Sequence, residues 1–336
     1  MDNKMKNCIG ISYLSRFITL SSMSRSWYHE PVLLQEVLDR VPEEAQTIMD
    51  GTLGHGGHTQ AILSYIIAKS EMMKQSQEGN ISWDLCAQHC GAVIVWVDRD
   101  ATMLQKAKER LSEFGEQVQY VHGSYATFKL ITQQTGMHQF DMILLDLGVN
   151  MEHFKDAERG FSIKKDWPLD MRFDTSDGIP ANERLNICTP EQFHETLEKY
   201  TDFSPKRMAH MEQSFFASWR DFSTTAELRQ RAKSIGTNEK ALAIFFQAIR
   251  ISVNRELQEL TMFLHSFPEY LTPNWRCIIL TYHSGEDRMV KESFKQRADQ
   301  WVCTILTKHV IAPQRSEKEH NPAARSAKMR VIQKGV

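Results

Sequence analysis

Short apolar runs alternate with longer amphipathic stretches through the first half of the chain. The apolar runs have the length of strands and cover residues 47–49, 92–97, 118–121 and 142–145. Apolar positions with helical spacing begin at Pro31 and recur in residues 60–69, 101–114 and 128–135. The runs at 92–97 and 142–145 are apolar throughout, as in parallel strands buried on both faces. The alternation predicts an α/β fold with a mainly parallel sheet.

This alternation stops near residue 156. Residues 156–240 are charged and predict helices, one of which follows Pro190 and another of which is capped by Thr224 or Thr225. A helix over 241–267 and a strand over 276–282 then return to the sheet. We therefore expect a sheet domain made of residues 28–155 and 241–336, with a helical substrate-recognition domain, 156–240, inserted in it. The polar residues 70–91 predict a loop-like insertion.

Composition places the chain among ordinary globular proteins. Its 336 residues are 41% hydrophobic and 24% charged, and the net charge of -2 gives no global basic field. No apolar run is long enough to span a bilayer. Six cysteines without regular spacing indicate reduced thiols rather than a disulfide framework. These features predict a cytoplasmic protein that has no contact with a membrane.

Both ends of the chain are locally basic. Residues 1–27 contain four basic residues and one acid, Asp2, which favours a disordered extension. The alternative is an organellar transit peptide, and the location would then be an organellar matrix. From Arg288 onward there are eleven Lys or Arg against four Asp or Glu. Phosphate contacts need such residues, and the candidates are Arg315, Arg325, Lys328 and Arg330, with Lys206 and Arg207 in the helical segment.

The segment from Asp50 to Thr59 carries the strongest chemical signal. Four glycines, at 51, 54, 56 and 57, lie between a predicted strand and a predicted helix. Glycine leaves the backbone bare to a ligand, and a helix N-terminus offers unpaired N–H groups. Acids end three of the predicted strands, where open α/β sheets bind ligands: Asp50, Asp98 and Asp146.

Two ligand classes use an acid at the end of the second strand to bond ribose hydroxyls, namely dinucleotides and S-adenosylmethionine. Asp98 has that position. The glycine spacing does not match the dinucleotide fingerprint G-x-G-x-x-G, and no phosphate-gripping G-x-x-x-x-G-K-[ST] is present. The pattern favours S-adenosylmethionine, with a nicotinamide dehydrogenase as the alternative.

Nine segments in order along the chain resemble one family. They are residues 28–33, 50–59, 97–100, 146–149, 158–162, 168–172, 246–254, 283–291 and 321–330. Together they resemble the RsmH family, also called MraW, of 16S ribosomal RNA cytosine-N4 methyltransferases. The resemblance implies a class I S-adenosylmethionine-dependent methyltransferase domain, Rossmann-like, with an inserted helical domain. It also implies 16S rRNA or the small ribosomal subunit as partner, and a homodimer is possible.

The resemblance also implies roles for individual residues. In the cofactor site, Gly56, Gly57 and His58 would line the methionine end, Asp98 would hold the ribose and Tyr125 would pack on the adenine. Asp146 would lie near the transferred methyl group. His153 stands where the family usually has glutamine, and the same cofactor contact is expected of it.

The transfer itself suggests further candidates. Asp146 is the candidate hydrogen-bond acceptor for the cytosine amine, or else a cofactor or structural acid. Asp170, with Arg172, would position the base or a phosphate, or form a buried ion pair between the domains. Asn254 would bond the base or cap a loop. The polar residues 283 and 286–288 would stabilise a turn or act in catalysis.

No metal is expected. Cys86, His89 and Cys90 have tight ligand spacing, but no second Cys/His pair at regular spacing accompanies them. The functional alternative to the enzyme is an RNA-binding or ribosome-assembly factor that keeps the methyltransferase fold. The intact glycine corner and strand-end acids favour the enzyme.

Overall fold

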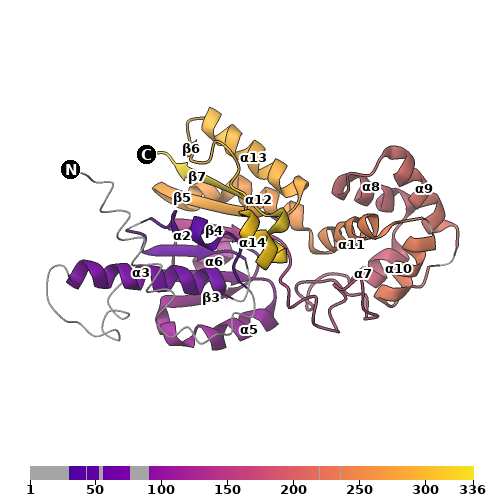
Figure 1. Cartoon of the computed structure of the whole chain (residues 1–336), viewed down its shortest axis with the longest axis horizontal. Helices are drawn as coiled ribbons and strands as arrows, with labels where there is room; N and C mark the ends of the chain where they lie inside the picture. Colours follow the sequence, from indigo (N-terminus) through magenta and orange to yellow (C-terminus); the bar gives the residue numbers. More distant parts are fainter. Residues whose placement is uncertain (1–29, 43, 53–55, 76–90, 219, 235) are drawn as a thin grey trace.

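The computed structural model describes residues 30–336 except 43, 53–55, 76–90, 219 and 235. Its centre is a seven-stranded sheet in the order β3-β2-β1-β4-β5-β7-β6 (Figure 1). The first five strands are parallel, and β7 runs antiparallel to both neighbours. The strands are β1 (Thr47–Asp50), β2 (Val93–Asp98), β3 (Val118–His122), β4 (Phe140–Asp146), β5 (Leu271–Thr281), β6 (Cys303–Ile305) and β7 (Lys328–Lys334). The predicted α/β class with a mainly parallel sheet is confirmed.

Helices cover both faces of the sheet. Successive strand residues point to opposite faces, so Ile48 and Met49 enter different apolar cores. One core is closed by α2 (Leu34–Leu38), α3 (Gly57–Gln75), α5 (Ala101–Arg110) and the 3₁₀ turn η2 (Pro322–Ser326). The other is closed by α6 (Phe128–Thr135), α12 (Glu256–Tyr270) and α13 (Ser284–Asp299). Two short elements complete this part, η1 (Ser112–Gln117) and α14 (Arg315–His320).

A separate helical body lies beside the sheet, on the right in Figure 1. It consists of α7 (Ala181–Ile187), α8 (Pro190–Tyr200), α9 (Pro205–Phe216), α10 (Thr225–Ser234) and α11 (Glu239–Asn254). Thr189 begins α8 with a capping box, as Pro190 had suggested. The body has its own core, in which Phe193, Phe215 and Phe245 are buried. The chain enters it after β4 and leaves it before β5.

The junction between the two parts differs from the expectation. One helix was predicted over 241–267, but the structure has two, α11 and α12, separated at Arg255. Arg255 has φ 54, in the left-handed region, which ends one helix and begins the next. Leu242, Phe245 and Phe246 belong to the core of the helical body. Packing therefore places the division near Arg255, not near residue 240.

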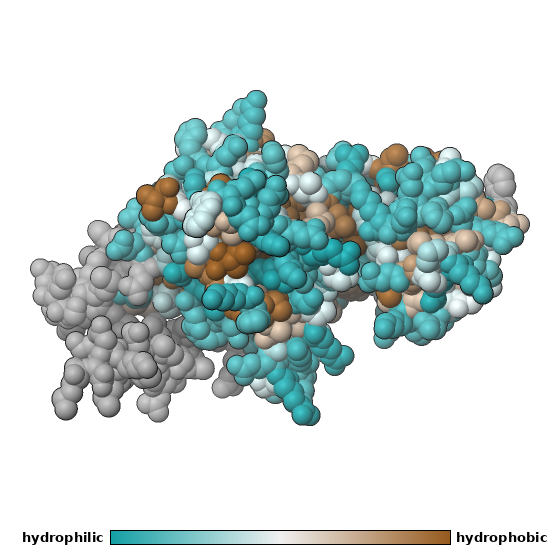
Figure 2. Space-filling model, turned by 90° about the horizontal axis from the view of Figure 1, so that it is seen from above, coloured by the Kyte–Doolittle hydropathy of each residue, from teal (hydrophilic) through white to brown (hydrophobic). Residues whose placement is uncertain are grey.

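Other elements extend past or lie outside the predictions. Helix α3 continues to Gln75, where a polar loop had been expected to begin at residue 70. The rest of that predicted insertion, the extension 1–27, and the Cys86–Cys90 segment lie outside the described residues. No helix in the described part of the chain has the length and apolar character needed to cross a membrane. In the space-filling view, apolar side chains gather in the recess between the sheet part and the helical body (Figure 2).

Candidate active site

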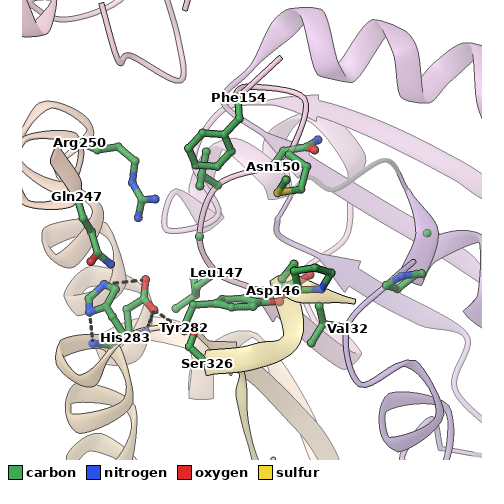
Figure 3. Close-up of a pocket in the computed structure, with 18 of the residues that line it drawn as sticks. Val32, Asp146, Leu147, Asn150, Phe154, Gln247, Arg250, Tyr282, His283 and Ser326 are labelled. Carbon is green, nitrogen blue, oxygen red and sulfur yellow. Dashed lines mark hydrogen bonds and ion pairs between the residues drawn. The ribbon is translucent and has the colours of Figure 1, made fainter. Parts of the chain in front are cut away.

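Two adjoining cavities lie at the carboxyl edge of the parallel strands. The smaller one, about 80 Å³, is lined by residues at or just after the ends of β1, β2, β3 and β4, including Gly51, Asp98 and Tyr125. The larger one, about 310 Å³, lies beside it and extends to α11 of the helical body (Figure 3). Five residues line both cavities: Asp146, Leu147, Gly148, Asn150 and Glu286. The strand-end loop after β4 is therefore the wall that the two cavities share.

The three strand-end acids have different surroundings. Asp98, the last residue of β2, lines the smaller cavity and accepts a 2.5 Å bond from the N–H of Asp100. Asp146 lines both cavities. Asp50 is buried and accepts a 2.6 Å bond from the Thr59 hydroxyl. Burial, only partly offset by this bond and by His58, raises the pKa of Asp50 to about 6. Asp50 thus holds the glycine corner together through its bond to Thr59, and it lines neither cavity.

The glycine corner brings bare backbone to the cavities at two positions. A Cβ on Gly51 would lie 2.5 Å from Leu145 Cδ2 and 2.9 Å from the Tyr125 Cβ, so no side chain fits there. Gly57 lines the larger cavity, and its Cβ would lie 2.5 Å from Pro31 Cγ. Gly56, with φ 71, packs against Trp96 and lines neither cavity. The glycine that lines the smaller cavity is therefore Gly51, which was not among the predicted site residues, and not Gly56.

His58 is held between the chain's first described segment and β4. Its Nε2 lies 3.0 Å from the carbonyl oxygen of Val32, and its Nδ1 lies 3.6 Å from Asp146 Oδ2. Because a carbonyl only accepts, Nε2 carries a proton and donates it to Val32. The Nδ1 edge is therefore the one that faces the Asp146 carboxylate, within the larger cavity.

Asp146 is also held by Tyr282, which follows β5. The Tyr282 hydroxyl donates a 2.6 Å bond to Asp146 Oδ1, and the Asp146 N–H donates a 2.5 Å bond to the Thr52 hydroxyl. Burial and the neighbouring carboxylate raise the pKa of the Tyr282 phenol well above its usual value, so it stays a donor. The Asp146 side chain keeps 21% of its surface exposed. The Tyr282 bond thus orients the carboxylate through Oδ1, with His58 near Oδ2, and the side chain is still open to the cavities.

Tyr125 and His153 both line the smaller cavity. Tyr125 packs its ring edge-on against Phe263, with centroids 5.7 Å apart. Burial, with the charge of Glu259, raises the pKa of its phenol well above the usual value. The His153 ring lies 4.9 Å from that of Phe161 and 5.4 Å from that of Phe173.

The Nε2 of His153 bonds to a buried carboxylate rather than to the cavity. It lies 2.9 Å from Asp100 Oδ2, which also pairs with Arg159 at 2.7 Å. Although burial alone raises the pKa of Asp100, the bond from His153 and the charge of Arg159 lower it to about 2. Burial lowers the pKa of the His153 imidazole, so its neutral form is favoured and Nε2 donates to Asp100. Within the described residues, Nδ1 has no hydrogen-bond partner.

The remaining predicted catalytic residues lie away from both cavities. Asp170 forms a two-pronged ion pair with Arg172, with bonds of 3.0 and 2.7 Å. Asn254, at the end of α11, donates to the carbonyls of Met171 and Arg250 and accepts from the N–H of Phe173. Every polar atom of the Asn254 side chain is thus used to tie the loop at 171–173 to the helix. Asp170 and Asn254 therefore position neighbouring parts of the chain and do not face the cavities.

Sequence reasoning missed most of the larger cavity's far wall. Gln247 and Arg250 reach it from α11, and Tyr282 reaches it from the end of β5. Two signals in the sequence could have found them. Gln247 and Arg250 belong to the family-like segment 246–254, and Tyr282 ends a predicted strand. Glu286, for which a turn or a catalytic role had been expected, is buried and lines both cavities. It accepts from the N–H of Tyr282 and lies 3.1 Å from His283 Nε2, so it also holds the turn.

The basic tail is partly committed to the fold. Asp287 on α13 pairs with Lys328 at 3.1 Å and with Arg330 at 2.7 Å, both on β7. The network thus joins α13 to the sheet, which was one of the two expectations for this turn. Arg325 is exposed and lies between residues that line the larger cavity. The described residues contain no group of three or more His, Cys, Asp or Glu side chains suited to a metal ion.

Known proteins resemble this chain over nearly all its length. The model of the MraW methylase family matches residues 78–335. A protein of Maridesulfovibrio salexigens named ribosomal RNA small subunit methyltransferase H is 33% identical, over 91% of this chain and 95% of the relative. Proteins of the same name from Pseudothermotoga lettingae and Chlamydia felis are 32% and 34% identical, over 91% and 93% of this chain and 98% and 99% of theirs. The chain therefore belongs to the MraW methylase family.

Proposed function

We propose that this protein transfers a methyl group from S-adenosylmethionine to the N4 amine of a cytidine in small-subunit ribosomal RNA. The relatives' names supply the RNA and the methyl transfer. The structural observation that supports the proposal most is the position of Asp146, whose side chain lines both cavities at the carboxyl edge of the sheet. A methyl donor whose adenosine part lies in the smaller cavity and a base that enters the larger one would meet at this residue.

The residues present fit the proposed cofactor. Gly51 lines the smaller cavity without a side chain of its own, and Asp98 offers a carboxylate at the same wall. We assign the ribose to Asp98, the adenine to Tyr125, and the methionine end to Gly57 and His58. The sulfonium of bound S-adenosylmethionine supplies an electrophilic methyl group. His153 Nδ1, a buried acceptor beside Asp98, would take a hydrogen bond from a cofactor donor.

Asp146 is proposed to act on the amine of the base. The N4 lone pair of cytosine is delocalised into the ring, so the amine is a weak nucleophile. A carboxylate that accepts a hydrogen bond from N4–H localises that lone pair and takes up the proton released on transfer. His58 Nδ1, 3.6 Å from Asp146 Oδ2, is placed to receive the proton next. Fixed geometry supplies much of the remaining rate enhancement.

We assign the other predicted residues to positioning. Asp170 holds Arg172, and Asn254 holds the loop that precedes the helical body, so both shape the wall without reaching the cavities. The base has to be unpaired or flipped to enter the larger cavity. Lys206, Arg207, Arg315 and Arg325 are the candidates for phosphate contacts. Lys328 and Arg330 contribute less, because Asp287 already neutralises part of their charge.

The proposed partner is the small ribosomal subunit or its free RNA, so the protein would act in the compartment that holds them. For the predicted cytoplasmic location, fractionation would show the protein with the cytoplasmic ribosomes. An organellar matrix location would show it with organellar ribosomes instead. The homodimer stays a prediction, and sedimentation equilibrium at several concentrations tests it.

Transfer of labelled methyl tests the function directly. We expect label from S-adenosylmethionine to enter small-subunit rRNA or particles that lack the modification, and mass spectrometry of the nucleosides to show N4-methylcytidine. An Asp146→Asn variant serves as the control and should bind the cofactor but transfer slowly. Binding of the RNA without transfer, at saturating cofactor, would instead identify an RNA-binding factor that keeps the fold.

A further inference from the structure

We propose that Gln247 and Arg250 recognise the pyrimidine edge of the target cytosine, while Phe154 stacks on its ring. The inference rests on the proposed function and names how that same site selects its base. Gln247 and Arg250 are three residues apart on α11, so their side chains share one face of the helix. Both line the larger cavity, and Figure 3 shows them across it from Asp146.

Arg250 is fixed before any base arrives. Its Nε and Nη2 bond to the two carboxylate oxygens of Glu256, at 2.9 and 3.0 Å, across the break at Arg255. Burial alone lowers the pKa of the Arg250 guanidinium, but the charge of Glu256 raises it above the usual value, so it stays protonated. The two donors of Nη1 are on the opposite edge of the planar group from Nε. Arg250 is therefore a rigid donor at the cavity wall.

A stacking surface lies at the same cavity. Phe154 and Met151 line it, and both are among the large apolar side chains that remain exposed, at 36% and 40%. The Phe154 ring is held edge-on against Phe161, with centroids 6.5 Å apart. An aromatic face that is held in place and left open to a cavity suits a flipped base, because every base offers a flat face for stacking.

The hydrogen-bond donors of Gln247 and Arg250 match the acceptors of cytosine and disfavour uracil. Cytosine has acceptors at N3 and O2 beside its N4 amine, whereas the N3 of uracil is a donor. With N4 toward Asp146, the neighbouring N3 would accept from Arg250 and O2 from the Gln247 amide. Uracil would instead place its N3–H against a cation and its O4 against the carboxylate of Asp146. Both pairs would repel, and this gives selectivity in addition to affinity.

A double-mutant cycle between protein and RNA tests the contact to N3. The target cytidine is replaced by 3-deazacytidine, whose ring carbon cannot accept, and kcat/KM for methyl transfer is measured. The protein variant is R250M/E256Q, which removes both partners of the ion pair and leaves no buried lone charge. In the wild-type chain we expect the base change to lower kcat/KM by about tenfold to a hundredfold. In the variant the same base change should cost less than threefold.

Because the same two bases are compared in both proteins, the altered reactivity of 3-deazacytidine cancels. An equal cost in both proteins overturns the contact while leaving the proposed function intact, whereas no transfer to native cytidine by the wild-type chain overturns the function itself. If R250M/E256Q does not fold, Arg250→Lys, which keeps a charge opposite Glu256 but loses the fork, takes its place in the cycle.

Two single variants test the other contacts. Gln247→Ala should lower kcat/KM for the native RNA by about fivefold to tenfold with unchanged cofactor affinity, whereas Gln105→Ala, an exposed position on α5, should have no effect. Phe154→Leu should raise the KM for RNA more than it lowers kcat, and Phe154→Tyr should restore it, because a ring is retained. An unchanged KM in Phe154→Leu would exclude the stacking role.

Discussion

The Tyr282 hydroxyl lies 2.6 Å from Asp146 Oδ1, and this bond joins the ends of β5 and β4 at the shared wall of the two cavities. The bond comes from a residue beyond the helical body in sequence, 136 positions after its partner. It restrains one oxygen of Asp146, while His58 lies near the other. The carboxylate is thereby aimed rather than free to rotate. This arrangement suits an acceptor that has to meet a base in one orientation.

Tyr282→Phe should slow methyl transfer without abolishing it. A hydrogen bond to a charged acceptor contributes about 1.5 to 3 kcal/mol, so we expect kcat to fall roughly tenfold with cofactor affinity retained. Since the bond favours the charged form of Asp146, the acid limb of the rate profile should move to higher pH. Rates from pH 5 to 9 and calorimetry with the cofactor measure both effects. An unchanged profile would show that Tyr282 does not act through Asp146.

Asp98→Ala should weaken binding of S-adenosylmethionine far more than binding of RNA. The loss of two hydrogen bonds to ribose hydroxyls predicts about a tenfold to hundredfold higher Kd for the cofactor. Isothermal titration calorimetry measures the cofactor and filter binding measures the RNA. Asp177→Ala, at an exposed loop position, is the matched control. Equal losses for both ligands would contradict the ribose assignment and indicate a general disturbance of the β2 end.

Asp50 should make the protein less stable as the pH rises. Its pKa is about 6 in the folded chain against 3.8 for the unconstrained group. The favourable contribution is complete below pH 3.8 and is lost as the pH rises through 6, a change of about 3 kcal/mol. Asp50→Asn should remove this slope and be more stable than the wild type at pH 8. Urea unfolding between pH 4 and 8 measures it, with Asp177→Asn as control.

Asp100 should have the opposite effect in acid. Its folded-state pKa of about 2 lies below the usual 3.8, so its contribution is present above pH 3.8 and is lost as the pH falls toward 2. The contribution is about 2 kcal/mol. His153→Gln keeps a donor to Asp100 and should retain most of it, whereas Arg159→Ala should not. Thermal melts at pH 3 and pH 7 distinguish the two variants, and identical melts would exclude the network.

Asn254→Ala should destabilise the fold more than it alters chemistry. It leaves the Met171 carbonyl and the Phe173 N–H without their buried partners, which costs roughly 2 to 4 kcal/mol. The loss should be visible as a lower Tm, with kcat per folded molecule within about threefold of the wild type. Asn254→Asp retains the acceptor for Phe173 and should lie between the two. A large loss of kcat at unchanged Tm would return Asn254 to a direct catalytic role.

The sequence predicted the sheet well where the strands are continuously apolar. β2 and β4 are buried on both faces, so their side chains alone mark them, and the acids that end them fall at the cavities as expected. β6 has three residues and β7 alternates charged and apolar positions, and neither was predicted. Their place is set by pairing with β5, which is a property of the assembled sheet and not of local sequence.

The site was predicted less completely. Asp98, Tyr125, Asp146 and His153 line the smaller cavity, because the carboxyl ends of β2, β3 and β4 lie along the same edge of the sheet. Gln247, Arg250 and Tyr282 come from distant elements, and only the packing of the helical body and of β5 brings them together. Asn254 shows the converse. It lies in a segment that carries the family resemblance, yet all its side-chain hydrogen bonds go to backbone groups of the protein itself.

The helical body departs and returns at neighbouring strands, β4 and β5, with the left-handed turn at Arg255 as its exit. Because β4 and β5 are neighbours in the sheet, the two points where the chain enters and leaves the helical body are close together, whichever helices lie between them. On the proposed assignments, exchanging the helical body would alter which base is admitted, because Gln247 and Arg250 belong to it. The strand ends proposed to hold the methyl donor would be inherited unchanged. The proposed base-selecting residues and the proposed transfer site thus belong to separable parts of the chain, open to independent evolution or redesign.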